Sequence, residues 1–147
     1  MLRFSAAVCV AMALVAGSVS AAEGWETDYE DALKQAKKQN RHILLDFTGS
    51  DWCGWCMRLD KEVFSQDAFK EYAKKNLVTV VLDFPRRKEQ SDELREQNEK
   101  LAKRYQVRGF PTIVVLSPEG KILARTGYRK GGAEKYVEHL KELIAGH

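Results

Sequence analysis

Two cysteines that stand three residues apart, shortly after an apolar run, constrain this chain more than any other feature. The run is Ile43-Leu44-Leu45-Asp46-Phe47, and the cysteines belong to Trp52-Cys53-Gly54-Trp55-Cys56. A short, almost continuously apolar run predicts a strand that is buried on both faces of a sheet. Because the pattern becomes helical from Cys53, the sequence predicts a strand, a turn and a helix that begins at the cysteine pair.

The position of the pair predicts redox chemistry. Cysteines at positions i and i+3 lie on one face of a first helical turn, so their sulfur atoms can bond reversibly. Free N–H groups and the helix dipole favour an anion at a helix N-terminus, and there the pKa of a cysteine falls from about 8.5 toward 7 or below. We therefore expect Cys53 to attack a substrate disulfide, and Cys56 then to attack Cys53 and release the reduced substrate.

Two other interpretations of the pair remain open. Two cysteines supply only half of a tetrahedral zinc site, and His42, His139 and His147 lack the spacing of paired ligands. A purely structural disulfide would close a very short loop, where cross-linking stabilises a fold least. We favour redox chemistry, and we expect no metal and no cofactor besides the Cys53–Cys56 disulfide.

The third cysteine, Cys9, lies in a predicted signal peptide at residues 1–21. One basic residue precedes an apolar stretch over 4–16, and small residues follow at Val19 and Ala21, which is typical of a secretory signal cleaved after residue 21 or 22. The stretch is shorter than the ~20 residues that span a bilayer. We expect a periplasmic or secreted protein that has two cysteines and no membrane span in its mature form.

Length and composition bound the remainder, residues 22–147, to a single domain. The whole chain has 147 residues, of which 44% are hydrophobic and 31% charged, a balance that excludes a disordered or low-complexity protein. Its net charge of +3 gives no reason to expect nucleic acid binding.

The rest of the chain alternates between helical and strand patterns. Thr27 and Glu30 predict a capping box for a first helix, and Ser65 is the expected N-cap of a later one. Residues 86–105 predict a solvated amphipathic helix rather than a partner-binding patch. Further strands are expected at 77–82, 112–116 and 122–126, the last two joined by a hairpin turn, before a C-terminal helix. This order predicts an α/β sandwich with a mixed central sheet.

These motifs together resemble the thioredoxin superfamily. The resemblance rests on Leu45-Asp46-Phe47 before the cysteine pair and on Gly109-Phe110-Pro111-Thr112 before a strand. Within that superfamily the chain is most similar to exported bacterial thioredoxin-like thiol:disulfide interchange proteins. The resemblance covers almost the whole of residues 22–147 and implies a three-layer α/β/α sandwich.

The resemblance also implies roles for residues outside the pair. Pro111 matches the family's cis-proline, with a trans strand-edge proline as the alternative, and Phe110 would offer backbone groups to a substrate strand. Asp46 matches a buried acid that accepts or relays the proton of Cys56, unless it is a solvated strand-end residue. Five turn residues before Cys53, one more than in ordinary thioredoxins, leave the geometry from Asp46 to the sulfur atoms open.

Residues beside the cysteine pair bear on substrate specificity and on the direction of electron transfer. We expect Trp52 to shape the active-site loop together with Gly54, and Trp55 to contact substrate. The Gly54-Trp55 dipeptide lacks the histidine of strong oxidants, which predicts a couple nearer roughly −270 to −200 mV than roughly −120 mV. The expected function is reduction or isomerisation of disulfides in protein substrates. The resemblance implies a membrane-embedded thiol:disulfide carrier as the electron donor. A disulfide-forming oxidase, a non-catalytic substrate-binding module and a metal-delivery protein are the alternatives.

Overall fold

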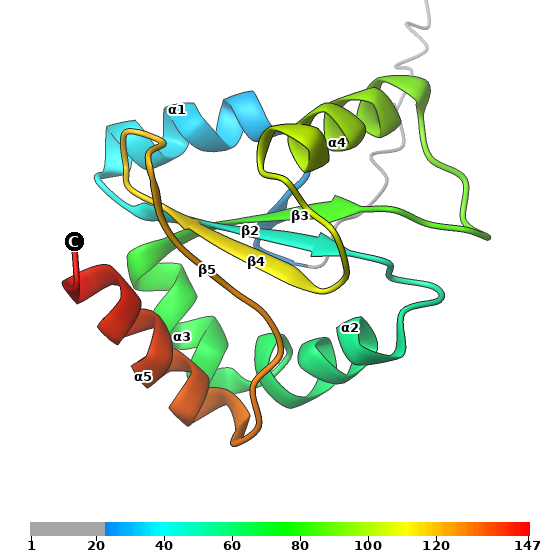
Figure 1. Cartoon of the computed structure of the whole chain (residues 1–147). Helices are drawn as coiled ribbons and strands as arrows, with labels where there is room; N and C mark the ends of the chain where they lie inside the picture. The colour runs from blue at the N-terminus through cyan, green and yellow to red at the C-terminus, as the bar shows by residue number, and fades with distance from the viewer. Residues whose placement is uncertain (1–22) are drawn as a thin grey trace, which may run out of the picture.

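The computed structural model describes residues 23–147, so the predicted signal peptide and Cys9 lie outside the described residues (Figure 1). The order of helices and strands agrees with the prediction, with a short first strand and a π-helical segment (η1) added. The elements are β1 (Trp25–Glu26), α1 (Tyr29–Gln39), β2 (His42–Thr48), α2 (Gly54–Leu59), η1 (Asp60–Phe64), α3 (Asp67–Asn76), β3 (Leu77–Asp83), α4 (Asp92–Arg104), β4 (Thr112–Leu116), β5 (Ile122–Thr126) and α5 (Gly132–Ala145).

The five strands form one mixed sheet in the order β1-β3-β2-β4-β5. Strands β1 and β2 both run parallel to β3, whereas β4 is antiparallel to β2 and to β5. Phe47 pairs with Thr112 in the β2–β4 ladder. The C-terminal end of β2 therefore meets the N-terminal end of β4, and the segments beyond these ends, which carry the cysteine pair and Pro111, start from one edge of the sheet.

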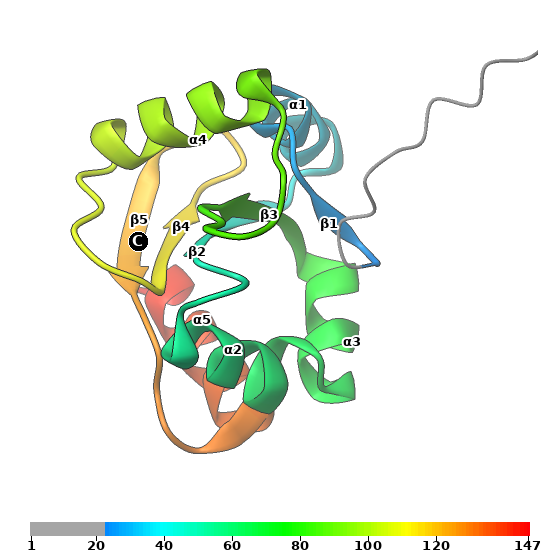
Figure 2. The same ribbon diagram turned by 90° about the vertical axis from the view of Figure 1, so that its right-hand side faces the viewer.

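Helices cover both faces of the sheet and complete the predicted three-layer sandwich (Figures 1 and 2). Helices α1 and α4 lie on one face, and α2, α3 and α5 lie on the other. Because strand side chains alternate between faces, Ile43, Leu45 and Phe47 pack into the core beneath α1 and α4. Leu44 packs into the opposite core, with Leu59 of α2.

Two predicted helix caps are wrong. The first helix is capped by Asp28, whose Oδ1 accepts the N–H of Asp31 at 2.9 Å, and not by Thr27. Thr27 stays outside the helix, and its carbonyl accepts a hydrogen bond from Nε2 of Gln97. Ser65 closes η1 instead of opening α3: its hydroxyl donates to the carbonyl of Lys61, so α3 begins one residue later than a Ser65 cap would place it.

Candidate active site

The cysteine pair lies where the prediction placed it, at the start of α2. Cys53 and Cys56 form a disulfide with their Cα atoms 5.2 Å apart. Cys53 is the N-cap of α2, and its Sγ accepts the backbone N–H of Cys56 at 3.2 Å. Both residues are buried, with 6% and 5% of their surfaces exposed, so their exposure does not distinguish them. Their positions in the helix do.

The electrostatics of the helix end favour a negative charge on Cys53. An N-cap atom faces the unpaired N–H groups and the positive end of the helix dipole. The N–H of Cys56, which points at Sγ of Cys53, would stabilise that sulfur as a thiolate after the disulfide is reduced. The arrangement can therefore form one reactive thiolate and hold a second sulfur within bonding distance of it.

Asp46 is a buried acid in the middle of β2. It lies on the same face of the sheet as Leu44, which is the face that α2 covers. Within residues 23–147, its Oδ1 has no hydrogen-bond partner. Burial, with smaller contributions from the charges of Asp60 and Asp83, raises the pKa of Asp46 to about 8. The carboxyl group is thus protonated at neutral pH, ready to exchange a proton in the pH range where thiols ionise.

The segment before β4 comes next to the turn that carries Cys53. The Phe110–Pro111 peptide bond is cis, as the resemblance implies. The Phe110 ring meets the Trp52 ring edge-on, with ring centroids 5.8 Å apart. Trp52 directly precedes Cys53, so this contact joins the turn before α2 to the segment that contains Pro111.

The turn before Cys53 has four residues, Gly49 to Trp52, and not the predicted five, because Thr48 pairs with Asp83 as the last residue of β2. This turn is fastened to the end of β3. The backbone N–H and the hydroxyl of Ser50 donate to the carboxylate of Asp83, at 2.9 and 2.5 Å. Nε1 of Trp52 donates to the carbonyl of Phe84 at 2.7 Å. A side chain at Gly49 would overlap the Trp52 ring, so the close approach of that ring requires glycine. The Trp52 ring thus packs against Gly49 within the turn and bonds the turn to the residue after β3.

Asp51 forms the outermost attachment of the turn. Its two carboxylate oxygens accept the backbone N–H groups of Arg86, Arg87 and Lys88 at 2.8–2.9 Å. These bonds, with that of Arg86 the largest, lower the pKa of Asp51 to about 2. Sequence reasoning missed this clamp, because an exposed aspartate gives no signal of partners 35 to 37 residues away.

Trp55 lies on the exposed side of the pair. Of its surface, 53% is exposed, and its ring lies 5.0 Å from that of Tyr128, which precedes α5. The guanidinium of Arg58 lies 5.4 Å from the Trp55 ring centroid and 5.5 Å from that of Tyr128. Glu62 accepts hydrogen bonds from Arg58 and from the Tyr128 hydroxyl, both at 2.6 Å. Sequence reasoning missed Tyr128 and Arg58, which join the Trp55 ring to the β5–α5 connection.

Residues 23–147 contain neither a cluster of metal ligands nor a membrane-spanning helix. No group of three or more His, Cys, Asp or Glu side chains gathers there as a metal site would require. Over the same residues, no helix has the length and apolar character needed to cross a membrane.

Comparison with known proteins gives consistent matches. A family profile described as a thioredoxin-like domain matches residues 29–144. Disulfide bond reductase DsbH of Chlamydia pneumoniae is 40% identical over 120 residues, which are 82% of this chain and 72% of DsbH. Thioredoxin-related protein DsbJ of the same organism is 31% identical over 103 residues, which are 70% of this chain but only 30% of DsbJ.

Solved structures match as well. A structure of a DsbH oxidoreductase superposes with a TM-score of 0.80 at 36% identity, and the match covers 97% of this chain and 96% of that one. A disulphide isomerase from Xylella fastidiosa superposes with a TM-score of 0.61 at 23% identity, covering 88% and 99% of the two chains. The second match shows the shared fold alone.

Proposed function

The chain belongs to the thioredoxin-like family of disulfide oxidoreductases, and on that premise we propose that it is an exported protein-disulfide reductase or isomerase. The observation that carries the proposal is the Cys53–Cys56 disulfide at the N-terminus of α2, with Sγ of Cys53 accepting the N–H of Cys56.

The reaction runs through a mixed disulfide. The Cys53 thiolate attacks one sulfur of a substrate disulfide, and the other substrate sulfur leaves as a thiolate that takes up a proton. Cys56 then loses its proton and attacks Sγ of Cys53, which releases the second substrate thiol. Two electrons pass from the protein dithiol to the substrate, and the protein is left with the Cys53–Cys56 disulfide. An isomerase differs in that a substrate thiol displaces Cys53 before Cys56 does.

The ionised form of Asp46, a minority form at neutral pH, is the proposed acceptor of the Cys56 proton. A general base works best when its pKa lies near the working pH, and the raised pKa of Asp46, about 8, meets that condition. The same buried, unpartnered Oδ1 is a costly feature in a purely structural residue. Its position on the face that α2 covers supports the role.

Substrate is proposed to dock across the cis-proline segment and Trp55. The backbone of Phe110, beside Pro111, would pair with an extended substrate strand, and the exposed Trp55 ring would contact apolar side chains that flank the substrate cysteine. The network of Arg58, Glu62 and Tyr128 supports the Trp55 ring in one orientation.

We also propose that the chain acts outside the cytoplasm. The support is the signal-like sequence at residues 1–21, whose removal after residue 21 or 22 would leave residues 22–147 as one domain. An oxidising compartment would keep the pair oxidised, so a reductase needs a donor that transfers two electrons by thiol–disulfide exchange, and a membrane-embedded carrier is the proposed donor. The disulfide itself is then the only redox group required.

Reduction of insulin disulfides tests the proposal. The dithiol form of the wild-type chain should reduce insulin with dithiothreitol as the recycling reductant, and Cys53→Ser should lose that turnover. Cys56→Ser should accumulate a mixed disulfide with the substrate through Cys53, which mass spectrometry detects. A redox titration against glutathione supplies the direction: a potential near roughly −120 mV would favour the oxidase over the reductase. Absence of insulin reduction by the wild type would overturn the proposal.

A further inference from the structure

Positively charged side chains gather at the end of the sheet opposite to the cysteine pair. The end of α1, the start of β2, the end of α3 and the β4–β5 hairpin meet there, on the left side of Figure 1. The cationic residues of these segments are Lys37, Lys38, Arg41, Lys74, Lys75 and Lys121. The five lysines are exposed, and Arg41 is partly buried. We call these six residues the basic end of the molecule.

The register of the sheet brings the segments of the basic end together. His42, next to Arg41, pairs with Leu77, the residue that follows α3. Ile43 pairs with Leu116, the last residue of β4 before the hairpin. Because paired strands lie about 4.8 Å apart, the residues that flank these pairs belong to one surface. Cations from α1, α3 and the hairpin therefore share that surface.

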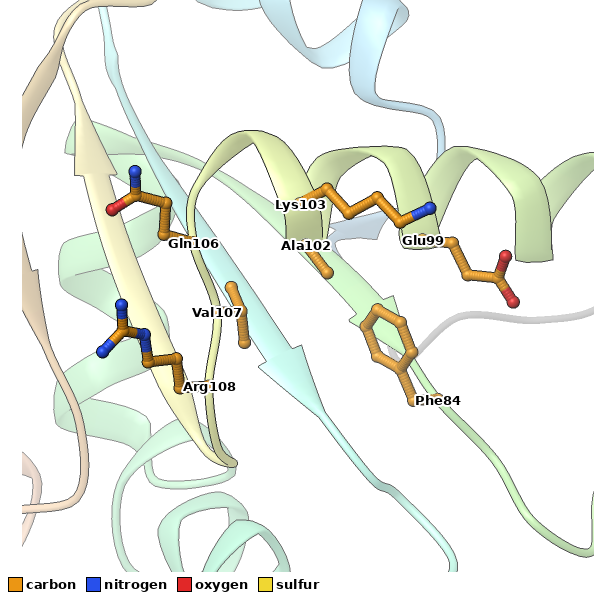
Figure 3. Close-up of a pocket in the computed structure, with 7 residues that line it drawn as sticks. All are labelled: Phe84, Glu99, Ala102, Lys103, Gln106, Val107 and Arg108. Carbon is orange, nitrogen blue, oxygen red and sulfur yellow. The ribbon is translucent and has the colours of Figure 1, made fainter.

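Carboxylates offset little of this charge. Within residues 23–147, the salt bridges involve none of the six cations. Glu119, in the hairpin, and Glu142, in the last turn of α5, supply two carboxylates at this end. Beside the cysteine pair, by contrast, charges of both signs are mixed, and Lys103, Arg108 and Glu99 line one pocket there (Figure 3). The net charge of the whole chain is only +3, so positive charge is concentrated at the basic end.

The helix dipole accounts for part of the basic end. Cations stabilise the last turn of a helix, and the lysine pairs that end α1 and α3 lie in such turns. Arg41 and Lys121 lie outside the helices, so this effect does not explain them. Ile122, which follows Lys121, exposes 53% of its surface. The basic end therefore has more charge and more apolar surface than the stability of the fold requires.

This combination fits the surface of a bilayer better than an acidic protein. Arginine is the usual partner of carboxylates at protein interfaces, whereas lysine is a hydrated point charge on a flexible stem, and five of the six cations are lysines. At a bilayer surface, cations attract anionic headgroups, and an apolar side chain reaches the boundary with the acyl chains. Ile122 begins β5 next to Lys121, where it can make that second contact.

We propose that the basic end docks reversibly on a membrane surface that contains anionic phospholipids. The cysteine pair lies at the other end of the strands, so docking leaves Cys53 facing the aqueous phase, where protein substrates approach it. Attachment would also keep the domain near an electron donor in the same membrane. The docking goes beyond the proposed function and does not depend on it.

Cosedimentation with vesicles tests the proposal. The oxidised protein of residues 22–147 is used, so that the apolar stretch at 4–16 cannot itself bind lipid. The vesicles contain either phosphatidylcholine alone or an equal mixture of phosphatidylcholine and phosphatidylglycerol. The wild type should sediment with the mixed vesicles only, and the bound fraction should fall as added salt shortens the Debye length.

Charge reversal locates the bound surface. Lys75→Glu/Lys121→Glu should weaken binding to the mixed vesicles at least about 30-fold, because each cation near an anionic surface strengthens binding about fivefold. It should keep the wild-type rate of insulin reduction, since its changes lie at the other end of the sheet from Cys53, and that rate also shows that the variant is folded. Lys61→Glu/Lys103→Glu makes the same change in net charge at exposed positions outside the basic end, and it should weaken binding less than about threefold.

A second pair of variants tests the apolar contact. Ile122→Ser should weaken binding to the mixed vesicles about fivefold, since part of a large side chain no longer leaves water. Met57→Ser is the matched control in α2, at a residue with 45% of its surface exposed, and it should bind as the wild type does. Equal binding by the two variants would remove Ile122 from the docking surface.

The possible failures separate this proposal from the proposed function. A wild type that stays in the supernatant with mixed vesicles overturns the docking, and retention on immobilised polyglutamate in the same buffer would then make an acidic polypeptide the occupant. Equal losses in the two double variants also overturn it, because binding would then follow net charge alone. Binding is measured on the disulfide form and needs no turnover. A wild type that binds the vesicles but reduces no insulin would therefore overturn the proposed function and leave the docking intact.

Discussion

Two aspartates, one in the strand before the turn and one within the turn, have opposite environments. Asp46 is buried in β2 without a partner for Oδ1 among residues 23–147, and its pKa rises to about 8. Asp51 accepts three backbone N–H groups at the surface, and its pKa falls to about 2. Five residues of sequence separate an acid that stays protonated at neutral pH from one that is ionised throughout the physiological range.

The two environments suit the two aspartates to different roles: Asp46 can exchange a proton, and Asp51 holds a loop in place. A protonated, unpartnered acid weakens the fold but can exchange a proton near neutral pH. A carboxylate whose two oxygens accept three backbone N–H groups holds a loop in place and stays ionised near neutral pH. The turn must stay in place while the sulfur atoms at its end react. The ionised Asp51 fixes it at the surface, and the protonated Asp46 lies in the strand before it.

The largest expected effect comes from removing the buried carboxyl group. Because the pKa of Asp46 is higher in the folded chain than in the unfolded one, the folded state retains a proton that the unfolded state loses above pH 4. The stability of the wild type therefore falls between about pH 4 and pH 8 on account of this group. Asp46→Asn should be more stable than the wild type, by an amount that grows from near zero at pH 4 to on the order of 5 kcal/mol at pH 8.

Denaturant unfolding of the oxidised protein at several pH values measures this effect. Asp51→Asn is the matched control, with the same chemical change five residues away, and it should show no such gain at pH 8. A stability difference for Asp46→Asn that is constant with pH would show that Asp46 is not titrating in the folded protein. If Asp46 also serves Cys56, the same variant should release reduced substrate from the mixed disulfide more slowly than the wild type.

A smaller effect is expected from the indole hydrogen bond that fastens the turn. Trp52→Phe keeps an aromatic ring against Phe110 but removes the N–H that donates to the carbonyl of Phe84. The free energy of unfolding should fall by about 1 kcal/mol, the usual net value of such a bond. Trp55→Phe, at the exposed end of the pair, should change it less. Equal losses in the two variants would show that the hydrogen bond does not anchor the turn.

The core of the fold followed from short-range patterns in the sequence. The buried runs that became β2, β3 and β4, and the cysteine pair that opens α2, each carry their signal within a few residues. Strand β1 has only two residues, which is too few for any periodicity. The choice between Thr27 and Asp28 as N-cap also lay beyond local patterns, because both are good capping residues. The two residues differ in a distant contact: Gln97 of helix α4 donates a hydrogen bond to the carbonyl of Thr27, and Asp28 caps the helix.

In the candidate site, too, local motifs predict some residues, whereas other properties depend on distant parts of the chain. The motifs identify Cys53, Cys56 and Pro111, and the structure brings the segments that hold them to one edge of the sheet. The raised pKa of Asp46 depends on burial and on Asp60 and Asp83, which no local pattern reveals. The clamp of Asp51 depends on backbone groups of a loop far along the chain, and backbone donors have no sequence signature at all.

The smallest effect should be confined to the loop that Asp51 holds. Since the pKa of Asp51 is lower in the folded chain than in the unfolded one, its stabilisation is present above about pH 4 and is lost as the pH falls through about 2. The backbone amide signals of Arg86, Arg87 and Lys88 in an NMR spectrum should therefore shift together, with a midpoint near pH 2.

Asp51→Asn should abolish that shared titration, because its amide oxygen can still accept N–H groups but cannot be protonated in this range. Asp51→Ala should instead increase the amide exchange rates of the three residues at neutral pH, since no acceptor remains to protect them. Amide signals of β2 serve as the internal reference and should stay unchanged in both variants. A midpoint near 4 in the wild type would mean that the three bonds do not hold the carboxylate in its charged form, and the contrast with Asp46 would then rest on burial alone.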